Sequence, residues 1–130
     1  MPAPLPPIPT LALSTGAPIP RLGFGTFKIS HGTYEAVSSA LAIGYRHIDT
    51  AQMYGNEAEV GRAIADSGIS REQIFLTSKL NNSNYEPRPA RTSFDQTLED
   101  LRTDYVDLFL IYWPLPTPTQ IGRVSCRERV

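Results

Sequence analysis

The sequence predicts an α/β fold in which parallel strands alternate with helices that cover them. Three observations lead to this prediction. Apolar segments typical of strands alternate with segments of helical periodicity, two of the helical segments end at a glycine, and a hairpin pattern precedes them. Alternation of this kind requires crossover connections, which make neighbouring strands parallel. The two common folds that satisfy it are the doubly wound sheet and the eight-stranded barrel.

The first elements expected are a hairpin and a short strand. Residues 10–22 hold two short apolar runs around the turn sequence "STG", which predicts a small hairpin. Pro18 and Pro20 are compatible with a hairpin that lies at the edge of the fold. The segment "GFGTF", residues 23–27, predicts a short strand.

Three helices and three further strands follow in alternation. Apolar residues recur at helical spacing in three segments, as Phe94, Leu98 and Leu101 do in the last of them. Helices are expected over residues 32–44, 56–68 and 88–103, and strands over residues 45–51, 74–80 and 105–113. Four strands and three helices would make about half of the ~250 residues of a complete barrel.

The two ends of the chain depart from this pattern. Residues 1–9 are rich in proline and are expected to be disordered or extended. Residues 121–130 have no hydrophobic period, and we expect a non-native tail there, with a natural polar tail as the alternative. Residues 10–120 are then the expected domain, a partial one.

The composition argues against several classes of protein. A formal net charge of −1 provides no basic surface for nucleic acid. No segment approaches the roughly 20 apolar residues that span a membrane. Two histidines and one cysteine form no metal-binding pattern. The single Cys126 fits a reducing compartment, and we expect a cytoplasmic protein.

Polar side chains lie at the carboxyl ends of three of the expected strands, where active sites of parallel α/β folds form. Asp49 ends the strand "YRHI", and Tyr54 lies in the loop after it. Lys79 follows "IFLTS", and Tyr112 and Trp113 follow "VDLFLI". We therefore expect an acid, a base and two phenols to meet at one rim of the fold.

These groups suit the reduction of a carbonyl group. Hydride addition to carbon leaves negative charge on oxygen, which then needs a proton donor. A phenol with a pKa of about 10 is a weak acid near neutral pH, and a neighbouring ammonium lowers that pKa. Tyr54 and Lys79 would be this pair, and the Asp49 carboxylate would hold the lysine. The alternative is that Asp49 and Lys79 form only a structural ion pair.

The glycines of "GFGT" do not match a dinucleotide-binding loop of the Rossmann type. Lys28 stands where the third glycine of G-x-G-x-x-G would be. Glycines at a strand end more simply allow a flat ligand or another chain segment to approach the backbone closely.

Four segments together resemble the aldo-keto reductase family. They are "PRLGFGTF", "AIGYRHIDTAQMYGNEAEVGRAI", "IFLTSKL" and "LEDLRTDYVDLFLIYWP", and the resemblance covers about residues 10–116. It implies the N-terminal half of a (β/α)8 TIM barrel preceded by a β-hairpin. It also implies reduction of aldehydes or ketones to alcohols with NADPH, or with NADH as the alternative cofactor, without metal or flavin.

The resemblance also assigns catalytic roles. It implies that Tyr54 donates the proton, that Lys79 lowers the pKa of Tyr54, and that Asp49 holds Lys79. The family's fourth catalytic residue is a histidine that hydrogen-bonds the substrate carbonyl, and Tyr112 stands in its place here. A phenol can donate such a bond but cannot form an imidazolium. A natural variant and a single-base sequence error are both compatible with Tyr112.

Further positions correspond to the family's binding sites. Gly25, Thr26 and Asp49 are similar to positions that bind the nicotinamide and its ribose. The positions similar to the substrate pocket are Phe27, Tyr54 and Trp113.

The resemblance covers only about half of a barrel. We therefore expect an inactive or incomplete fragment of a carbonyl reductase, which by itself neither folds stably nor binds NADPH tightly. The alternatives are a non-catalytic, cofactor-binding regulatory subunit of the same fold and a truncated non-functional product. The substrate's identity within aldehydes and ketones and the oligomeric state are not predicted.

Overall fold

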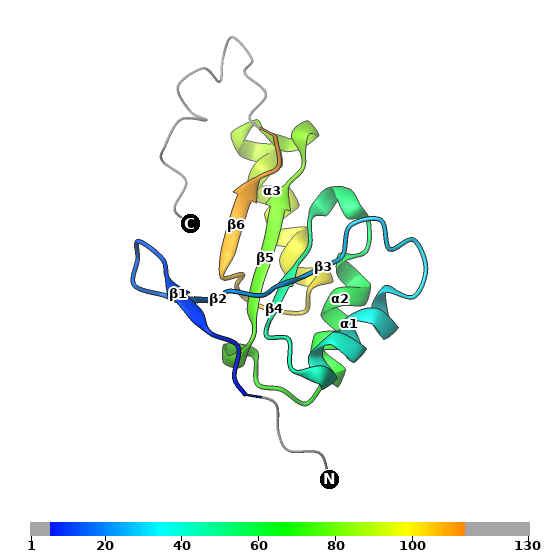
Figure 1. Ribbon diagram of the computed structural model, residues 1–130. Coiled ribbons are helices and arrows are strands. Elements are labelled where there is room, and N and C mark those ends of the chain that lie inside the picture. Colours follow the sequence, from blue (N-terminus) through cyan, green and yellow to red (C-terminus); the bar gives the residue numbers. More distant parts are fainter. Residues whose placement is uncertain (1–5, 114–130) are drawn as a thin grey trace.

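The computed structural model describes residues 6–113. Within them, a four-stranded parallel sheet has three α-helices on one of its faces (Figure 1). The strand order β3-β4-β5-β6 follows the order of the chain. A doubly wound sheet reverses its strand order and has helices on both faces, whereas a barrel adds strands in sequence inside a ring of helices. The arrangement is therefore that of the first part of a barrel.

The described residues contain all the elements that the alternation predicts. The strands of the parallel sheet are β3 (Phe24–Gly25), β4 (His47–Asp49), β5 (Phe75–Leu80) and β6 (Leu108–Ile111). The α-helices are α1 (Thr33–Ile43), α2 (Glu57–Asp66) and α3 (Pro87–Asp100). Most expected strands were too long at both ends, because apolar residues continue into the loops that flank the paired segments.

Three single-turn 3-10 helices were not predicted. They are η1 (Gln52–Tyr54), η2 (Arg71–Gln73) and η3 (Asn82–Asn84). Such short turns contain too few residues to show a hydrophobic period. One of them, η1, carries Tyr54, so this residue lies in a turn of defined geometry.

A hairpin precedes the sheet, as predicted. Strands β1 (Thr10–Ala12) and β2 (Pro18–Pro20) pair antiparallel, with Leu11 opposite Ile19. Gly16 has a φ of 87° in the connecting turn, a conformation that favours glycine.

A glycine directly follows the last residue of α1, as predicted, but α2 ends before its predicted glycine. Gly44 caps α1 with a φ of 116°, and its N–H bonds the carbonyl oxygens of Ala40 and Leu41. Helix α2 ends two residues before Gly68, because the Ser67 hydroxyl donates to the carbonyl oxygen of Ile64 at 2.7 Å. A serine that bonds the backbone in this way competes with helix continuation.

The hydrophobic core lies between the sheet and the helices. Its fully buried members include Ile48 and Leu76 from the strands and Val37 and Val60 from α1 and α2. Leu101, at the end of α3, joins the same cluster. Successive side chains of a strand point to opposite faces, so the residues between the core positions face away from the helices.

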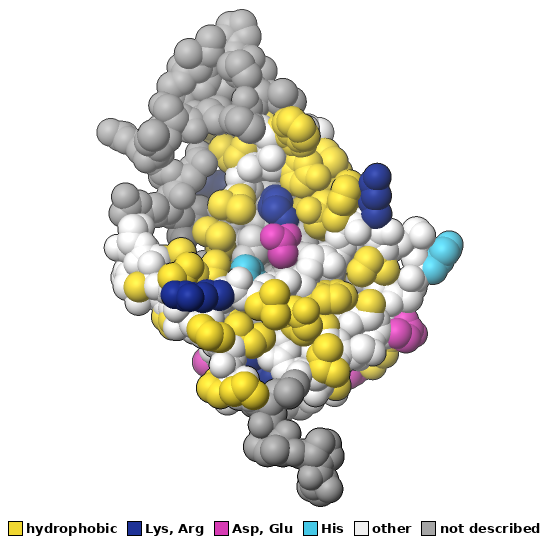
Figure 2. Space-filling model, viewed as in Figure 1, with side chains coloured by type: hydrophobic (Ala, Val, Ile, Leu, Met, Phe, Trp, Pro, Cys, Tyr) yellow, Lys and Arg dark blue, Asp and Glu magenta, His cyan; other side chains and the backbone are white. Residues whose placement is uncertain are grey.

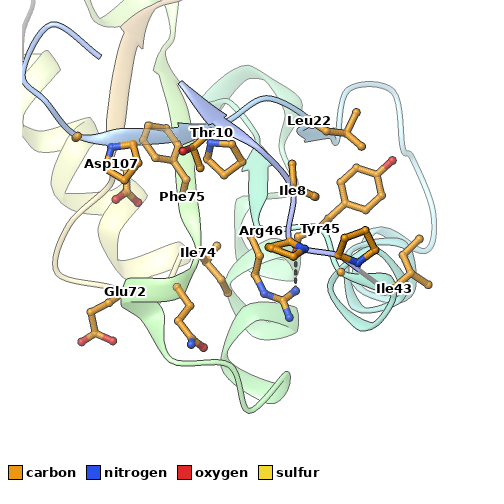
Figure 3. Close-up of a pocket in the computed structure, with 17 residues that line it drawn as sticks. Ile8, Thr10, Leu22, Ile43, Tyr45, Arg46, Glu72, Ile74, Phe75 and Asp107 are labelled. Carbon is orange, nitrogen blue, oxygen red and sulfur yellow. Dashed lines mark hydrogen bonds between the residues drawn. The ribbon is translucent and has the colours of Figure 1, made fainter. Parts of the chain in front are cut away.

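A cavity of about 790 Å³ lies at the amino ends of the strands (Figure 3). One wall of this cavity comes from the N-terminal segment and the other from residues at the amino ends of β4 and β5 (Figure 3). The N-terminal residues include Ile8, Thr10 and Leu22, and those at the sheet include Tyr45, Arg46, Ile74 and Phe75. Asp49 and Lys79 lie toward the opposite, carboxyl ends of their strands, so this cavity is separate from the predicted site. The predictions for residues 1–5 and for the tail 121–130 lie outside the described residues.

Candidate active site

Asp49 and Lys79 project from the sheet face that the helices leave open. Their strand neighbours Ile48 and Ser78 are buried on the helix side, and the alternation of a strand places Asp49 and Lys79 on the other face. Basic and acidic atoms adjoin near the middle of this face, with hydrophobic side chains around them (Figure 2). The structure thus brings together two residues that are 30 positions apart in the sequence.

The Lys79 ammonium has an oxygen neighbour for each of its three N–H donors. It forms an ion pair with the Asp49 carboxylate, donates to the carbonyl oxygen of Thr50 at 3.0 Å, and donates to the Tyr54 hydroxyl at 3.3 Å. An ammonium has no acceptor. The Tyr54 hydroxyl therefore receives a hydrogen bond from Lys79 and keeps its own proton for another partner.

The pKa of Tyr54 lies above the usual phenol value. Burial is the largest cause, because it disfavours the phenolate. The hydrogen bond and the positive charge of Lys79 lower the pKa, while the negative charge of Asp49 raises it. Lys79 thus acts in the predicted direction, but burial outweighs it, so Tyr54 is a protonated phenol at neutral pH.

The turn η1 fixes the position of Tyr54. The Tyr54 N–H bonds the carbonyl oxygen of Ala51 at 3.1 Å, and the Gly55 N–H bonds that of Gln52 at 3.3 Å. Gly55 has a φ of 69°, so the sequence "YG" supplies the residue that can close this turn. Tyr54 is held between the end of β4 and the start of α2.

Four aromatic residues, including Tyr54, are in successive ring contact beside the Asp49–Lys79 ion pair. The ring centroids of Phe27 and Tyr54 are 5.1 Å apart, those of Tyr54 and Tyr112 are 6.0 Å apart, and those of Tyr112 and Trp113 are 6.3 Å apart. Phe27 and Trp113 are each 55% exposed. All four predicted aromatic residues therefore share one rim, and two of them present apolar surface to solvent.

The end of β6 is fixed by a residue that the sequence did not suggest. The Tyr85 hydroxyl accepts a hydrogen bond from the Trp113 N–H at 2.8 Å and also donates to the Trp113 carbonyl oxygen. No sequence pattern links Tyr85 to a residue 28 positions away. This clamp holds Trp113, and with it the neighbouring Tyr112, at the rim.

Gly25 and Thr26 have different environments. Gly25 is exposed opposite Asp49 in the β3–β4 register, and no atom lies within 4 Å of the position that a Cβ would take. Thr26 is fully buried, and its hydroxyl and its N–H each donate to the Asp49 carbonyl oxygen at 3.0 Å. Gly25 therefore leaves open space for a ligand, whereas the Thr26 side chain supports the backbone of Asp49.

Buried polar residues beneath the site were also missed. Asn56 donates to the Thr26 carbonyl oxygen at 3.0 Å, which ties the start of α2 to the end of β3. The Glu57 carboxylate accepts hydrogen bonds from Ser78 and Thr97. The sequence "NE" before an apolar helical pattern was a signal for a helix start, but it gave no hint of these distant partners.

The model of the "Aldo/keto reductase family" matches residues 21–124 of the chain. The chain belongs to this family. The match contains every residue that the sequence analysis proposed for the site.

Curated relatives in the family have about half of their aligned residues in common with the chain. The yeast (Saccharomyces cerevisiae) "Aldehyde reductase YPR1" is 50% identical over 121 residues, which are 90% of this chain and 38% of that protein. The yeast "Glycerol 2-dehydrogenase (NADP(+))" is 52% identical over 106 residues, which are 80% of this chain and 33% of that protein. The chain thus spans less than half of the length of these relatives.

Solved structures agree with the fold. An aldo/keto reductase from Brucella melitensis matches with a TM-score of 0.83 and 49% identity, over 90% of this chain and 46% of that one. A Bombyx mori aldo-keto reductase (AKR2E4), solved in complex with NADP, matches with a TM-score of 0.81 and 35% identity, over 88% of this chain and 41% of that one. The described residues are thus the N-terminal part of an α/β TIM barrel.

Two kinds of feature are missing from the part of the chain that the structure describes. Residues 6–113 include no helix long and apolar enough to cross a membrane. The same residues hold no cluster of three or more histidine, cysteine, aspartate and glutamate side chains that could bind a metal ion.

Proposed function

We propose that this chain carries the proton-transfer site of an NADPH-dependent aldo-keto reductase that reduces aldehydes or ketones to alcohols. The observation that supports this proposal is the contact of Lys79 Nζ with both the Asp49 carboxylate and the Tyr54 hydroxyl, at 3.3 Å from the latter. For carbonyl reduction, Tyr54 would be the proton donor, Lys79 its cationic neighbour and Asp49 the counter-ion of the lysine. A cytoplasmic location fits the single cysteine.

Tyr54 is the proposed proton donor. A phenol is protonated at neutral pH, and burial raises the pKa of Tyr54 further; its O–H is not used by Lys79, which is itself a donor. As the carbonyl oxygen of the substrate gains negative charge, the phenol transfers its proton to that oxygen. The nearby ammonium then stabilises the phenolate that is left.

Lys79 and Asp49 have supporting roles in this proposal. The Lys79 side chain is 15% exposed, and a charge so largely removed from water needs a partner. Asp49 supplies that partner and, with the Thr50 carbonyl oxygen, orients the ammonium toward Tyr54. Asp49 itself acts through the lysine.

Tyr112, Phe27 and Trp113 are the proposed substrate-facing residues. The ring of Tyr112 meets that of Tyr54 edge-on, at an interplanar angle of 86°. Its hydroxyl would donate a second hydrogen bond to the carbonyl oxygen, the role that a histidine has in the family. Exposed Phe27 and Trp113 would pack on the apolar part of the aldehyde or ketone.

The residues around Gly25 fit a nicotinamide cofactor. When bound, NADPH or NADH supplies a hydride to the carbonyl carbon. Gly25 leaves open backbone beside Asp49, which a flat ring could approach and which a Cβ would obstruct. Asp49 is 36% exposed and can accept hydrogen bonds from a ribose. Thr26 would act indirectly, through the Asp49 backbone that it bonds.

The proposal is tested by NADPH binding and turnover with the 130-residue chain. We expect cofactor fluorescence to report weak binding, and slow oxidation of NADPH in the presence of a simple aromatic aldehyde. Turnover that is equal in the Tyr54→Phe variant would contradict the role of Tyr54.

A non-catalytic, cofactor-binding subunit is the second candidate, because Tyr112 replaces the family's histidine. Binding of NADPH by the chain with no turnover of any aldehyde, together with no gain of turnover in Tyr112→His, would favour it. A chain that binds no cofactor would instead fit a truncated product without function.

A further inference from the structure

Gln52, in the turn that carries Tyr54, has polar contacts at both ends of its side-chain amide. Its Oε1 accepts a hydrogen bond from the Asn81 N–H at 2.8 Å and lies 3.4 Å from Asn84 Nδ2. Its Nε2 donates to the Thr97 hydroxyl at 3.1 Å. The amide thus connects η1 to the end of β5 and to α3.

The chain of hydrogen bonds continues inward to Glu57. The Thr97 hydroxyl donates to Glu57 Oε1 at 3.2 Å, and the Ser78 hydroxyl donates to Glu57 Oε2 at 2.7 Å. Glu57, Ser78 and Thr97 are all buried. A buried polar group without a hydrogen-bond partner costs free energy of folding, so breaking any bond of this network would be unfavourable.

The direction of these bonds fixes the orientation of Gln52. The ionised Glu57 carboxylate only accepts hydrogen bonds, so Thr97 then directs its proton toward Glu57. The Thr97 oxygen can then accept a bond from Gln52 Nε2, and this leaves Gln52 Oε1 to face the Asn81 N–H. Each group therefore determines the donor and acceptor roles of the next.

The ends of the network lie close to Tyr54 and Lys79 along the chain. Gln52 is two residues before Tyr54 in η1, and Ser78 and Asn81 lie on either side of Lys79 along the chain. None of the network side chains contacts the Lys79 ammonium, whose oxygen neighbours are Asp49, Thr50 and Tyr54. An effect of the network on the pair would therefore be one of position.

We propose that Gln52, oriented by Thr97 and Glu57, is a positioning residue that holds Tyr54 within hydrogen-bonding distance of Lys79. The inference rests on the proposed function, because it assigns Gln52 to the same site. Without the Gln52 amide, the turn would keep its two backbone hydrogen bonds but lose the side-chain bond to Asn81, the residue after the strand that carries Lys79. The Tyr54 ring would then be free to move away from the ammonium.

The test measures the proximity of Tyr54 and Lys79 directly. The chain has two lysines, Lys28 and Lys79, so a Lys28→Arg background leaves one lysine signal. With ¹³C-labelled lysine and tyrosine, the nuclear Overhauser effect (NOE) between the Lys79 side chain and the Tyr54 ring is recorded at neutral pH. Trimethylamine N-oxide in the buffer favours the compact state. The Tyr54→Phe variant identifies the tyrosine signal.

Gln52→Ala and Thr97→Val are expected to lose this NOE, because one removes the amide and the other replaces the linking hydroxyl at similar volume. Thr97→Ser, which keeps the hydroxyl, is expected to retain it. Gln96→Ala is the matched control, because Gln96 is an exposed residue of α3 that bonds only Asp100 among the described residues. Circular dichroism and urea unfolding report whether each variant is folded.

An unchanged NOE in folded Gln52→Ala would overturn the inference. Loss of the NOE in Gln96→Ala as well would also overturn it, since the effect would then reflect general loosening. The readout needs no turnover. An NOE that depends on Gln52 in a chain without reductase activity would support the positioning network and count against the proposed function alone.

Discussion

At the scale of single residues, the hydrogen bonds of Lys79 decide which group of the site is left to react. The three N–H donors of Lys79 bond to Asp49, Thr50 and Tyr54. The Tyr54 oxygen accepts one of these bonds, and within residues 6–113 its own O–H has no acceptor. The chemistry proposed for this chain depends on that single proton.

Replacing Tyr54 by phenylalanine removes the proton donor and leaves the ring contact with Phe27. We expect turnover of an aldehyde to fall by about 10²–10⁴-fold, the usual contribution of general acid catalysis. NADPH affinity should stay within about twofold of that of the parent chain, because the phenol acts on the substrate oxygen. Steady-state kinetics and cofactor fluorescence check this, and a large loss of affinity would point to a structural role.

The pH dependence of reduction follows from the raised pKa of Tyr54. The protonated phenol is the active form, so turnover should be constant near neutral pH and decline as pH rises toward the pKa of Tyr54. In Lys79→Met the lowering effect of the ammonium is lost, and we expect the pKa of Tyr54 to rise further. ¹³C-tyrosine NMR titration measures this shift. A fall in the pKa of Tyr54 in Lys79→Met would contradict the assignment.

At the scale of elements, α2 and α3 approach closely because position 61 has no side chain. A Cβ on Gly61 would lie 2.4 Å from the carbonyl oxygen of Asp100 and 2.6 Å from Leu101 Cα. These are backbone atoms, which cannot turn aside as a flexible side chain would. Gly61 therefore sets the distance between the two helices that cover β5.

We expect Gly61→Ala to lower the free energy of unfolding by about 1–3 kcal/mol, the range for overpacking. The preference of alanine for helices offsets a smaller amount, about 1 kcal/mol. Urea unfolding measures the result. Gly68→Ala serves as a comparison, because Gly68 has open space around it but a φ of 73° that strains an alanine. Stabilisation by Gly61→Ala would contradict the close approach.

The start of α2 carries a buried acid whose ionisation opposes folding. Burial raises the pKa of Glu57 above its usual 4.5, and the bonds from Ser78 and Thr97 only partly counter this. Between the pKa of the unfolded chain and that of the folded chain, the folded state holds the extra proton. The contribution of Glu57 to stability therefore decreases as pH rises through that window.

Glu57→Gln should remove this dependence, because an amide does not titrate. We expect the stability of the parent chain relative to Glu57→Gln to be highest below pH 4.5 and to fall as pH rises above that value. Urea unfolding at a series of pH values gives the difference. A difference that rises with pH would reverse the assigned direction of the pKa shift.

At the scale of the whole molecule, the described part has a core on one side of its sheet only. The helices cover one face (Figure 1), and hydrophobic side chains lie exposed on the other (Figure 2). Exposed large hydrophobic residues include Phe27, Leu110 and Trp113. Strands β3 and β6 each have one neighbour in the sheet formed by residues 6–113. Uncovered apolar groups and open strand edges contribute little to stability and favour association.

We therefore expect the free energy of unfolding of the 130-residue chain to be below about 5 kcal/mol, the lower end of the range for stable domains. Urea unfolding followed by circular dichroism gives the value, and measurement at several protein concentrations separates unfolding from association. A concentration-independent transition well above that value would show that one covered face is sufficient.

The sequence by itself determined the order of the elements and the types of residue at the strand ends. The spacing of apolar residues within each segment reflects which side chains are buried, so helices and strands can be predicted from the local sequence. It placed β4, β5 and β6 and predicted that Asp49, Lys79 and Tyr112 lie at the carboxyl ends of these strands. It also placed Tyr54 in the loop after β4, and the family motif then supported the role of Tyr54 as proton donor.

Only the tertiary structure decided how these residues act. It buried Thr26 beneath Asp49, clamped Trp113 with Tyr85, and made burial outweigh Lys79 in setting the pKa of Tyr54. It also joined Gln52 to Thr97, 45 positions away. Hydrogen bonds and desolvation depend on which distant segments pack together, and that information has no fixed spacing in the sequence from which it could be predicted.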